Sequence, residues 1–287
     1  MDIMIILQLI VLLGAIYIGV RLGGIGIGYA GGAGVLVLGL CLGMKPGNIP
    51  WDVIMIIGSV IAAISAMQLA GGLEYLVYIA EKILYKNPKY INYLAPIVTY
   101  VLTIFAGTGH TAFSMIPVIV EVAKGENIRP SVPLSMSVVS SQVAITASPV
   151  SAAAIFMTGA LEPFGWSYPT LLGIWILTTF VGCMLTAFIM THISKLDLSS
   201  DPIYQERLKE GLVKPPVGLQ EMVITPTAKL SVWIFLVGVL CVVAYASAIS
   251  PAVGLIKPVV VPRDAAIISL MLAVGALITI FFEIKLG

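Results

Sequence analysis

The sequence predicts an all-α polytopic membrane protein. Of its 287 residues, 59% are hydrophobic and only 10% are charged, and the mean hydropathy is +1.07. A soluble domain carries roughly a quarter charged residues. Several apolar runs also approach or exceed the roughly 18 residues that mark a membrane-spanning helix. The net charge of +1 gives no reason to expect nucleic acid as a partner, whereas membrane lipid is expected.

The apolar segments follow one another along most of the chain. We expect spanning segments at about 3–20, 24–43, 52–70, 132–158, 169–193, 229–249 and 265–284. The first lacks the basic n-region of a cleavable signal and is expected to stay as a membrane helix. Residues 72–86 have one apolar helical face with charged residues mostly away from it, which predicts an interfacial helix. The polar residues 194–228 predict a cytoplasmic linker with a short helix at 202–212.

Two apolar segments contain residues that disfavour a straight helix. Glycines, hydroxyl residues and a histidine lie at the centre of residues 92–120, and hydroxyl residues with a proline interrupt 132–158. Non-helical backbone at membrane depth persists only where protein or a water-filled cavity satisfies it. Paired interruptions of this kind indicate the substrate site of a secondary transporter. The candidate substrate-binding residues are Gly107, Thr108, Gly109, His110, Thr111, Thr146, Ser148, Pro149 and Ser151.

The positions of the basic residues favour a re-entrant hairpin at 92–120, because Lys and Arg in loops set membrane orientation. If this segment returns to the face that it entered, one face carries twelve of the 15 basic residues and the other carries Lys45, Lys257 and Arg263. If the segment crosses, the split becomes six against nine. The hairpin reading places its tip near Thr108, the N-terminus in the periplasm and the linker in the cytoplasm.

The same reading predicts an inverted repeat. Five crossings precede the linker, so the sixth runs opposite to the first, as inverted-topology repeats require. Residues 1–193 then form the first repeat, and 229–287 form the first two helices of a second, incomplete repeat. We expect such a chain to lack the partner surface of its site and not to transport when isolated.

The same residues also permit other interpretations. Small and hydroxyl residues such as Ser135, Ser137 and Ser140 often serve only close helix packing, and His110 fits a hairpin cap as well as a substrate contact. An intramembrane enzyme would need an acid to orient His110, and the apolar core offers none. The three cysteines have no metal-ligand spacing and only two histidines occur. We therefore expect no enzyme activity, no metal and no cofactor, with the coupling ion left open.

Short motifs in a fixed order resemble a known family. They are residues 21–25 (RLGGI), 80–84 (AEKIL) with 87–90 (NPKY), 107–110 (GTGH), 127–130 (NIRP) and 147–151 (ASPVS). Together they resemble the anaerobic C4-dicarboxylate transporter (Dcu) family over essentially the whole chain. The resemblance implies an ion-transporter-type fold, built from two inverted repeats with one re-entrant hairpin each.

The resemblance also implies a function. It implies exchange or uptake of the C4-dicarboxylates fumarate, succinate, malate and aspartate by alternating access. The protein would act in the bacterial inner membrane during anaerobic metabolism. The alternative is a dicarboxylate-sensing or partner-dependent half-transporter subunit. A homodimer is one assembly to test.

Overall fold

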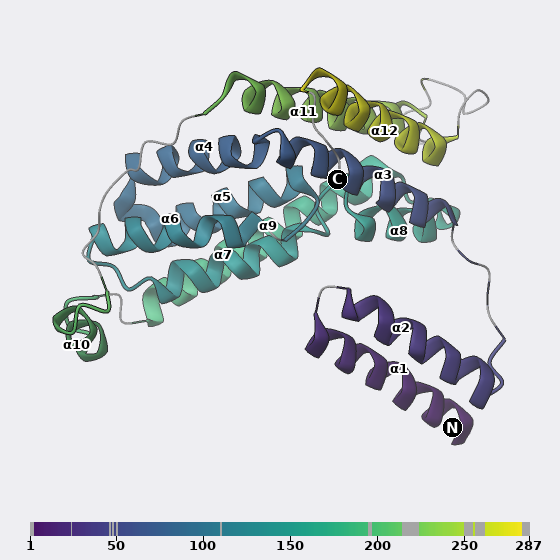
Figure 1. Cartoon of the computed structure of the whole chain (residues 1–287), viewed down its shortest axis with the longest axis horizontal. Coiled ribbons are helices and arrows are strands. Elements are labelled where there is room, and N and C mark those ends of the chain that lie inside the picture. The colour runs from purple at the N-terminus through teal and green to yellow at the C-terminus, as the bar shows by residue number, and fades with distance from the viewer. Residues whose placement is uncertain are drawn as a thin grey trace. The chain divides into compact units, whose positions relative to one another are not determined.

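The computed structural model describes residues 3–23, 25–45, 47, 49, 51–109, 111–194, 197–213, 224–249, 255 and 262–282. These residues are almost entirely helical (Figure 1). The helices are α1 (Ile3–Leu22), α2 (Gly26–Leu36), α3 (Trp51–Leu69), α4 (Gly72–Lys86), α5 (Ile91–Ala106), α6 (Thr111–Gly125), α7 (Ser131–Ala144), α8 (Ala152–Leu161), α9 (Tyr168–Ile193), α10 (Pro202–Lys209), α11 (Pro226–Ala248) and α12 (Arg263–Phe281). Short turns of other helical type lie at η1 (Val37–Cys41), η2 (Pro88–Tyr90) and η3 (Glu162–Phe164). The chain divides into two compact units, residues 1–50 and 51–287.

The expectation of an all-α polytopic membrane protein is confirmed. Among the described residues, six helical segments are long and apolar enough to cross a membrane. Five of them correspond to predicted spans, namely α1, α3, α9, α11 and α12. The sixth, Pro88–Ala106, contains α5, which the sequence had assigned to the first arm of the hairpin. The predicted span 24–43 is a shorter apolar helix, Gly26–Cys41.

The first unit is a pair of helices held by close backbone approach. A Cβ atom added to Gly34 of α2 would lie 2.7 Å from the Cβ of Ala15 in α1. One added to Gly19 would lie 3.3 Å from the Cα of Ile27. Small residues at these positions let the two helices pack in van der Waals contact, which is how membrane helices associate when lipid is as apolar as their side chains.

In the second unit, α11 and α12 pack on α3 (Figure 1). The contact is close, because a Cβ added to Gly275 of α12 would lie 3.3 Å from the Cα of Ala63 in α3. A core of buried residues fills the interface, including Ile56 and Met67 of α3, Phe235 of α11 and Met271 of α12. Helices α11 and α12 therefore cover one face of α3, and another face of α3 is left to face α5 and α6.

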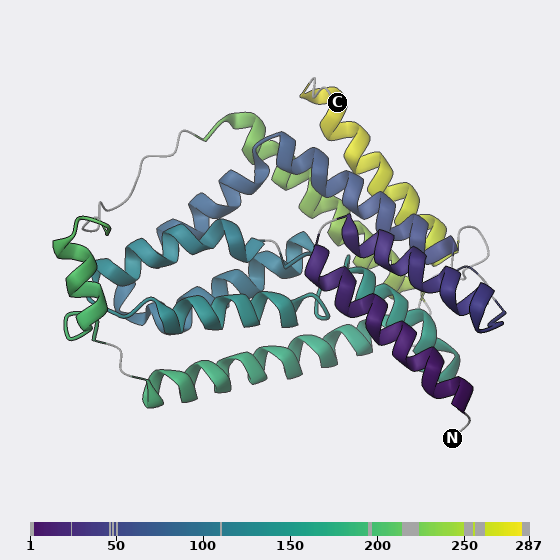
Figure 2. The same cartoon turned by 60° about the horizontal axis from the view of Figure 1, so that its bottom comes forward.

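Helices α5 and α6 form a helix–turn–helix, and α7 runs alongside it (Figures 1 and 2). Both arms share a core with α4, and Ile91 at the start of α5 lies in the same cluster as Val122 near the end of α6. The arms are therefore antiparallel, with the start and the end of the hairpin on one side. That the pair enters and leaves the membrane on one face stays a prediction, as does the interfacial placement of α4.

The start of the polar linker is fastened to the α6–α7 loop. The backbone N–H of Leu198 donates to the Asn127 carbonyl at 3.0 Å, and Asn127 Nδ2 donates to Asp197 Oδ1 at 2.9 Å. Arg129 pairs with Asp201, whose carboxylate also caps α10 by accepting from the Ile203 N–H at 3.0 Å. The pKa of the Asp201 carboxyl is lowered, chiefly by the hydrogen bond from Arg129. The linker helix α10 thus begins at the predicted residue and ends at Lys209, short of the expected 212.

Candidate functional site

The predicted break between residues 132 and 158 is present. Helix α7 ends at Ala144 and α8 begins at Ala152. The chain tightens into turns as α7 ends, with the N–H groups of Thr146 and Ser148 donating to carbonyls three residues back, at 3.2 Å each. A proline then disfavours helical backbone at the residue before it and has no N–H of its own. Pro149 therefore prevents helical backbone from continuing through the break, and α8 starts anew with Ser151 as its N-cap.

The hairpin tip is built from residues that permit a sharp reversal. Gly107 caps α5 in the left-handed region, with φ of 65°, and its N–H donates to the Thr103 carbonyl at 2.8 Å. Glycine adopts this conformation without the cost that a side chain imposes. Across the turn, the hydroxyls of Thr103 and Thr111 lie 2.7 Å apart and join the two arms.

The tip and the break touch each other. Ser148 Oγ donates to the carbonyl of Ile104 at 2.7 Å, and Ser141 Oγ donates to the carbonyl of Gly109 at 3.3 Å. A Cβ added to Gly107 would lie 3.1 Å from Cγ2 of Val150. Two interruptions that are far apart in sequence therefore form one region, as the paired-interruption pattern predicted.

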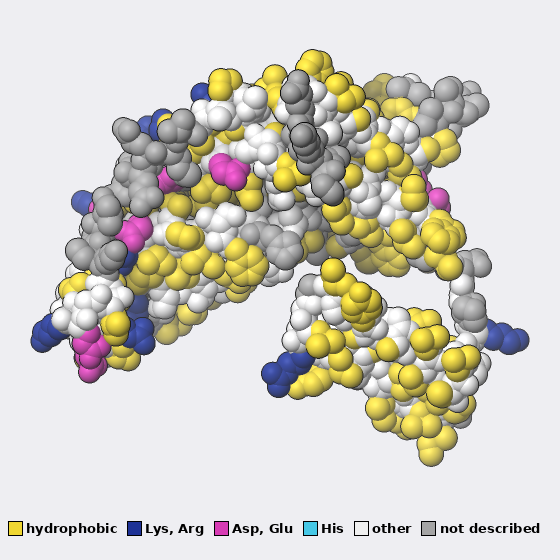
Figure 3. All heavy atoms as spheres, in the orientation of Figure 1, with side chains coloured by type: hydrophobic (Ala, Val, Ile, Leu, Met, Phe, Trp, Pro, Cys, Tyr) yellow, Lys and Arg dark blue, Asp and Glu magenta, His cyan; other side chains and the backbone are white. Residues whose placement is uncertain are grey.

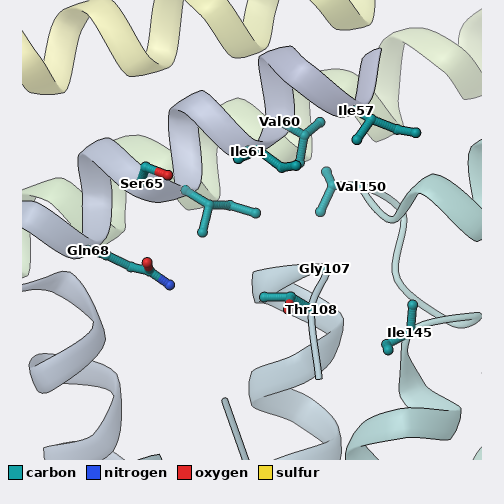
Figure 4. Close-up of a pocket in the computed structure, with 10 residues that line it drawn as sticks. Ile57, Val60, Ile61, Ser65, Gln68, Gly107, Thr108, Ile145 and Val150 are labelled. Carbon is teal, nitrogen blue, oxygen red and sulfur yellow. The ribbon is translucent and has the colours of Figure 1, made fainter. Parts of the chain in front are cut away.

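A cavity of about 570 Å³ lies where this region faces α3. It is lined by Gly107 and Thr108 of the tip, by Ile145 and Val150 of the break and by six residues of α3, which are Ile57, Val60, Ile61, Ile64, Ser65 and Gln68 (Figure 4). Pockets for small molecules commonly measure about 300–1,000 Å³ and are mostly apolar, with a few placed polar groups. The described lining fits that pattern, because its polar side chains are those of Ser65, Gln68 and Thr108.

The structure distributes the predicted site residues unevenly around this cavity. Gly107 and Thr108 line it. The other four predicted hydroxyl residues bond to protein groups: Thr111 to Thr103, Ser148 to Ile104, Thr146 to the Val143 carbonyl at 2.7 Å, and Ser151 to the Ala154 N–H at 3.1 Å. The Pro149 carbonyl accepts from the Tyr168 hydroxyl at 2.8 Å, and Gly109 is buried. His110 lies outside the described residues.

Sequence reasoning missed Ser65 and Gln68. Both lie on the face of α3 that looks toward the tip, and in Figure 4 the Gln68 side chain extends into the space beside Thr108. Their signal was present, because they are polar residues three apart in the second half of a helix whose other polar side chains are Asp52 and Ser59. Residues at this spacing share a helical face. Only the packing of α11 and α12 on the rest of α3 reveals which face is free.

The electrostatics of the site come from helix ends. Among the described residues, no Lys, Arg, Asp or Glu lines the cavity. Helices α5 and α7 end at the region where the tip meets the break, and α6 and α8 begin there. Helix N-termini carry about half a positive charge and favour anions, whereas helix C-termini carry about half a negative charge and disfavour them, so an anion is expected beside the starts of α6 and α8 and not beside the ends of α5 and α7. Within the described chain, no group of three His, Cys, Asp or Glu residues is placed to hold a metal ion.

The fold and the site together define a multi-pass membrane protein whose candidate ligand site is built from two interrupted helical segments. Residues 4–287 match the family described as anaerobic C4-dicarboxylate membrane transporter, and the chain belongs to this family. The resemblance drawn from the sequence motifs is thereby confirmed. Because the family consists of transporters, the expectation that the protein is not an enzyme also holds.

Curated relatives carry the same description. The C4-dicarboxylate transporter DcuA of Helicobacter pylori strain J99 is 63% identical over 278 residues, which cover 97% of this chain and 62% of that protein. Those of Wolinella succinogenes and Escherichia coli K12 are 60% and 52% identical over 281 residues, covering 98% of this chain and 64% of each relative. The chain thus spans less than two thirds of the length of these relatives. No solved structure matches it.

Proposed function

We propose that the chain belongs to a secondary carrier for C4-dicarboxylates and binds its substrate in the cavity between α3, the hairpin tip and the α7–α8 break. The observation that carries this proposal is the meeting of the two interruptions at one cavity with polar groups on its wall. The substrates would be fumarate, succinate, malate and aspartate, moved by exchange or uptake. The names of the relatives support the substrate class.

The chemistry of the cavity suits a weakly held dianion. Thr108 supplies a hydroxyl donor and Gln68 an amide donor, and Ser65 adds a second hydroxyl. The N-termini of α6 and α8 supply positive potential without a buried cation. A carrier must release its substrate after each crossing, and dipoles and hydroxyls bind an anion less tightly than a bidentate arginine does. Alternating access then requires the contact between tip and break to change as the site opens.

We further propose that the hairpin is re-entrant. At 1.5 Å per residue, the second arm α6 is about 22 Å long, short of the roughly 30 Å hydrocarbon core, whereas the segment Pro88–Ala106 that contains α5 is long enough to cross. On the face seen in Figure 3, the Lys and Arg side chains of residues 51–282 gather at the end that carries α10. The positive-inside rule makes this end cytoplasmic in a bacterial inner membrane. By the crossing order, the N-terminus is then periplasmic.

Ion pairs agree with this arrangement. Arg263 at the start of α12 pairs with Glu162, which follows α8, at 2.9 Å. Arg129 and Asp201 join two segments that the proposal places in the cytoplasm. Each pair thus connects residues assigned to the same side of the membrane, which fits the crossings that follow the hairpin and holds equally if the hairpin itself crosses.

The test is counterflow in proteoliposomes that hold the full-length carrier to which we propose this chain belongs, with labelled fumarate outside and succinate inside. Thr108→Val and Gln68→Leu should each raise the fumarate concentration at half-saturation roughly ten- to hundred-fold. The reason is that one hydrogen bond to a charged group is worth about 1.5–3 kcal/mol. Ser135→Ala is the matched control, since Ser135 is exposed on α7 and does not line the cavity. Equal losses in all three variants would refute the site.

The same experiment separates the alternative function. A sensing or partner-dependent subunit would bind fumarate, measured by calorimetry, yet give no saturable exchange in vesicles. Exchange by the purified protein would exclude that alternative. Absence of both binding and exchange would refute the proposed function in either form.

A further inference from the structure

A second hollow lies between α4 and α5, away from the residues of the proposed substrate cavity. It is a groove of about 280 Å³, and every residue that lines it is hydrophobic. Ala80, Val98 and Leu102 form its buried floor, each no more than 8% exposed. Ile79, Ile83 and Val101 form its rims and are 38–42% exposed. Because the side chain of Ala80 is small, space remains between the two rims.

The length of the groove matches one leaflet of a bilayer. Its lining on α5 runs from Leu94 to Phe105, which is about 16 Å at 1.5 Å per residue. Half of the hydrocarbon core is about 15 Å. A single acyl chain laid along α5 would therefore cover the groove from the headgroup level to the middle of the membrane. This places α4 beside α5 at that depth, in place of the interfacial position expected from the sequence.

Positive charge lies at the outer end of the groove. Lys86 follows Ile83 by three residues on α4 and so continues the face that forms the rim. Lys89 lies in the turn η2 that leads into α5. Both side chains are exposed, and within the described part of the chain neither forms an ion pair with an acidic residue. The two lysines therefore offer their charge to a ligand outside the protein.

We propose that this groove binds one acyl chain of an anionic phospholipid from the surrounding bilayer, with the lipid phosphate beside Lys86 and Lys89. Apolar length and paired basic charge occur together here, which is the combination that recognises an anionic lipid in preference to a zwitterionic one. Because α5 is the first arm of the hairpin, a bound chain would brace the arm that ends at the substrate cavity. The choice of the cytoplasmic leaflet rests on the proposed orientation.

The test measures lipid binding to the protein in detergent micelles by native mass spectrometry, without substrate. Phosphatidylglycerol should bind more tightly than phosphatidylcholine. Each juxtamembrane lysine contributes about fivefold in affinity, so K86Q together with K89Q should weaken phosphatidylglycerol binding about 25-fold. Val101→Trp should fill the groove and weaken binding of both lipids. Lys209→Gln and Leu177→Trp, at exposed positions on α10 and α9, are the matched controls and should change neither lipid.

A second measurement does not depend on the folding of variants. Phosphatidylglycerol with a photoreactive diazirine on its acyl chain should label peptides that contain residues 76–83 and 94–105 of the unmodified protein. Labelling of other helices alone would overturn the proposal. So would equal affinity for the two lipids, or binding that survives loss of both lysines. None of these outcomes bears on fumarate exchange, so they leave the proposed function to its own test.

Discussion

Gly107→Ala tests whether the hairpin tip packs closely against the α7–α8 break. The loss of stability should exceed the cost of placing an alanine in a left-handed turn. Gly107 has φ of 65°, and an alanine held there costs about 1–2 kcal/mol relative to glycine. The added Cβ would also lie 3.1 Å from Cγ2 of Val150, inside the 3.5–4.0 Å at which carbon atoms pack well. Overpacking of this kind costs about 1–3 kcal/mol. The expected total is a loss of about 2–5 kcal/mol in the free energy of unfolding.

Gly165→Ala provides the matched control. Gly165 has φ of 86°, and an added Cβ would meet no atom within 4 Å. In Gly165→Ala the free energy of unfolding should fall only by the cost of the left-handed backbone conformation, about 1–2 kcal/mol. The assay is unfolding by sodium dodecyl sulfate in mixed micelles, followed by far-ultraviolet circular dichroism. Equal losses in the two variants would refute the reasoning, because the tip would then have no close contact with Val150. Fumarate binding should weaken in Gly107→Ala and stay unchanged in Gly165→Ala.

Three further predictions concern the hairpin, the break and the linker. Cysteines at positions 89 and 125, in a background without native cysteines, should be labelled from the cytoplasmic side. Ser148→Ala should lower the free energy of unfolding by about 1–3 kcal/mol, because the carbonyl to which it donates stays buried. It should also weaken fumarate binding by loosening the tip. Asp201→Asn keeps the helix cap but removes the charge that pairs with Arg129, so amide hydrogen exchange at 126–129 should quicken.

Each of these has an outcome that contradicts it. Labelling of the two cysteines from opposite sides would mean that residues 92–120 cross the membrane. A surface change such as Ser135→Ala typically lowers the free energy of unfolding by at most roughly 0.5 kcal/mol. A loss no larger than this for Ser148→Ala would show that the hydrogen bond between tip and break contributes little to stability.

Because the pKa of Asp201 is lowered in the folded protein, linker docking should persist at neutral pH and be lost as the pH falls below 3.8. Protection factors at the amides of 126–129, corrected for the intrinsic pH dependence of exchange, that stay constant in that range would contradict the ion pair.

The sequence by itself determined the helices and their interruptions. Apolar length set the spans, because a helix must be about 20 residues long to cross the hydrocarbon core. Gly107 and Pro149 marked the turn and the break, because backbone freedom and a missing N–H act locally and need no tertiary context. The motifs around these residues were sufficient to recognise the family that the whole chain matches.

Only the tertiary structure decided which polar groups face the cavity. Ser148, Thr111 and Ser151 are all hydroxyl residues near the interruptions, yet each bonds to a protein group. Ser65 and Gln68 come from a helix that the sequence read as a plain span, and they line the cavity because α11 and α12 occupy the rest of α3. A hydroxyl group can form its hydrogen bond with a ligand or with the backbone. Which of the two it does depends on residues that lie far away in the sequence. Local patterns contain no record of those partners.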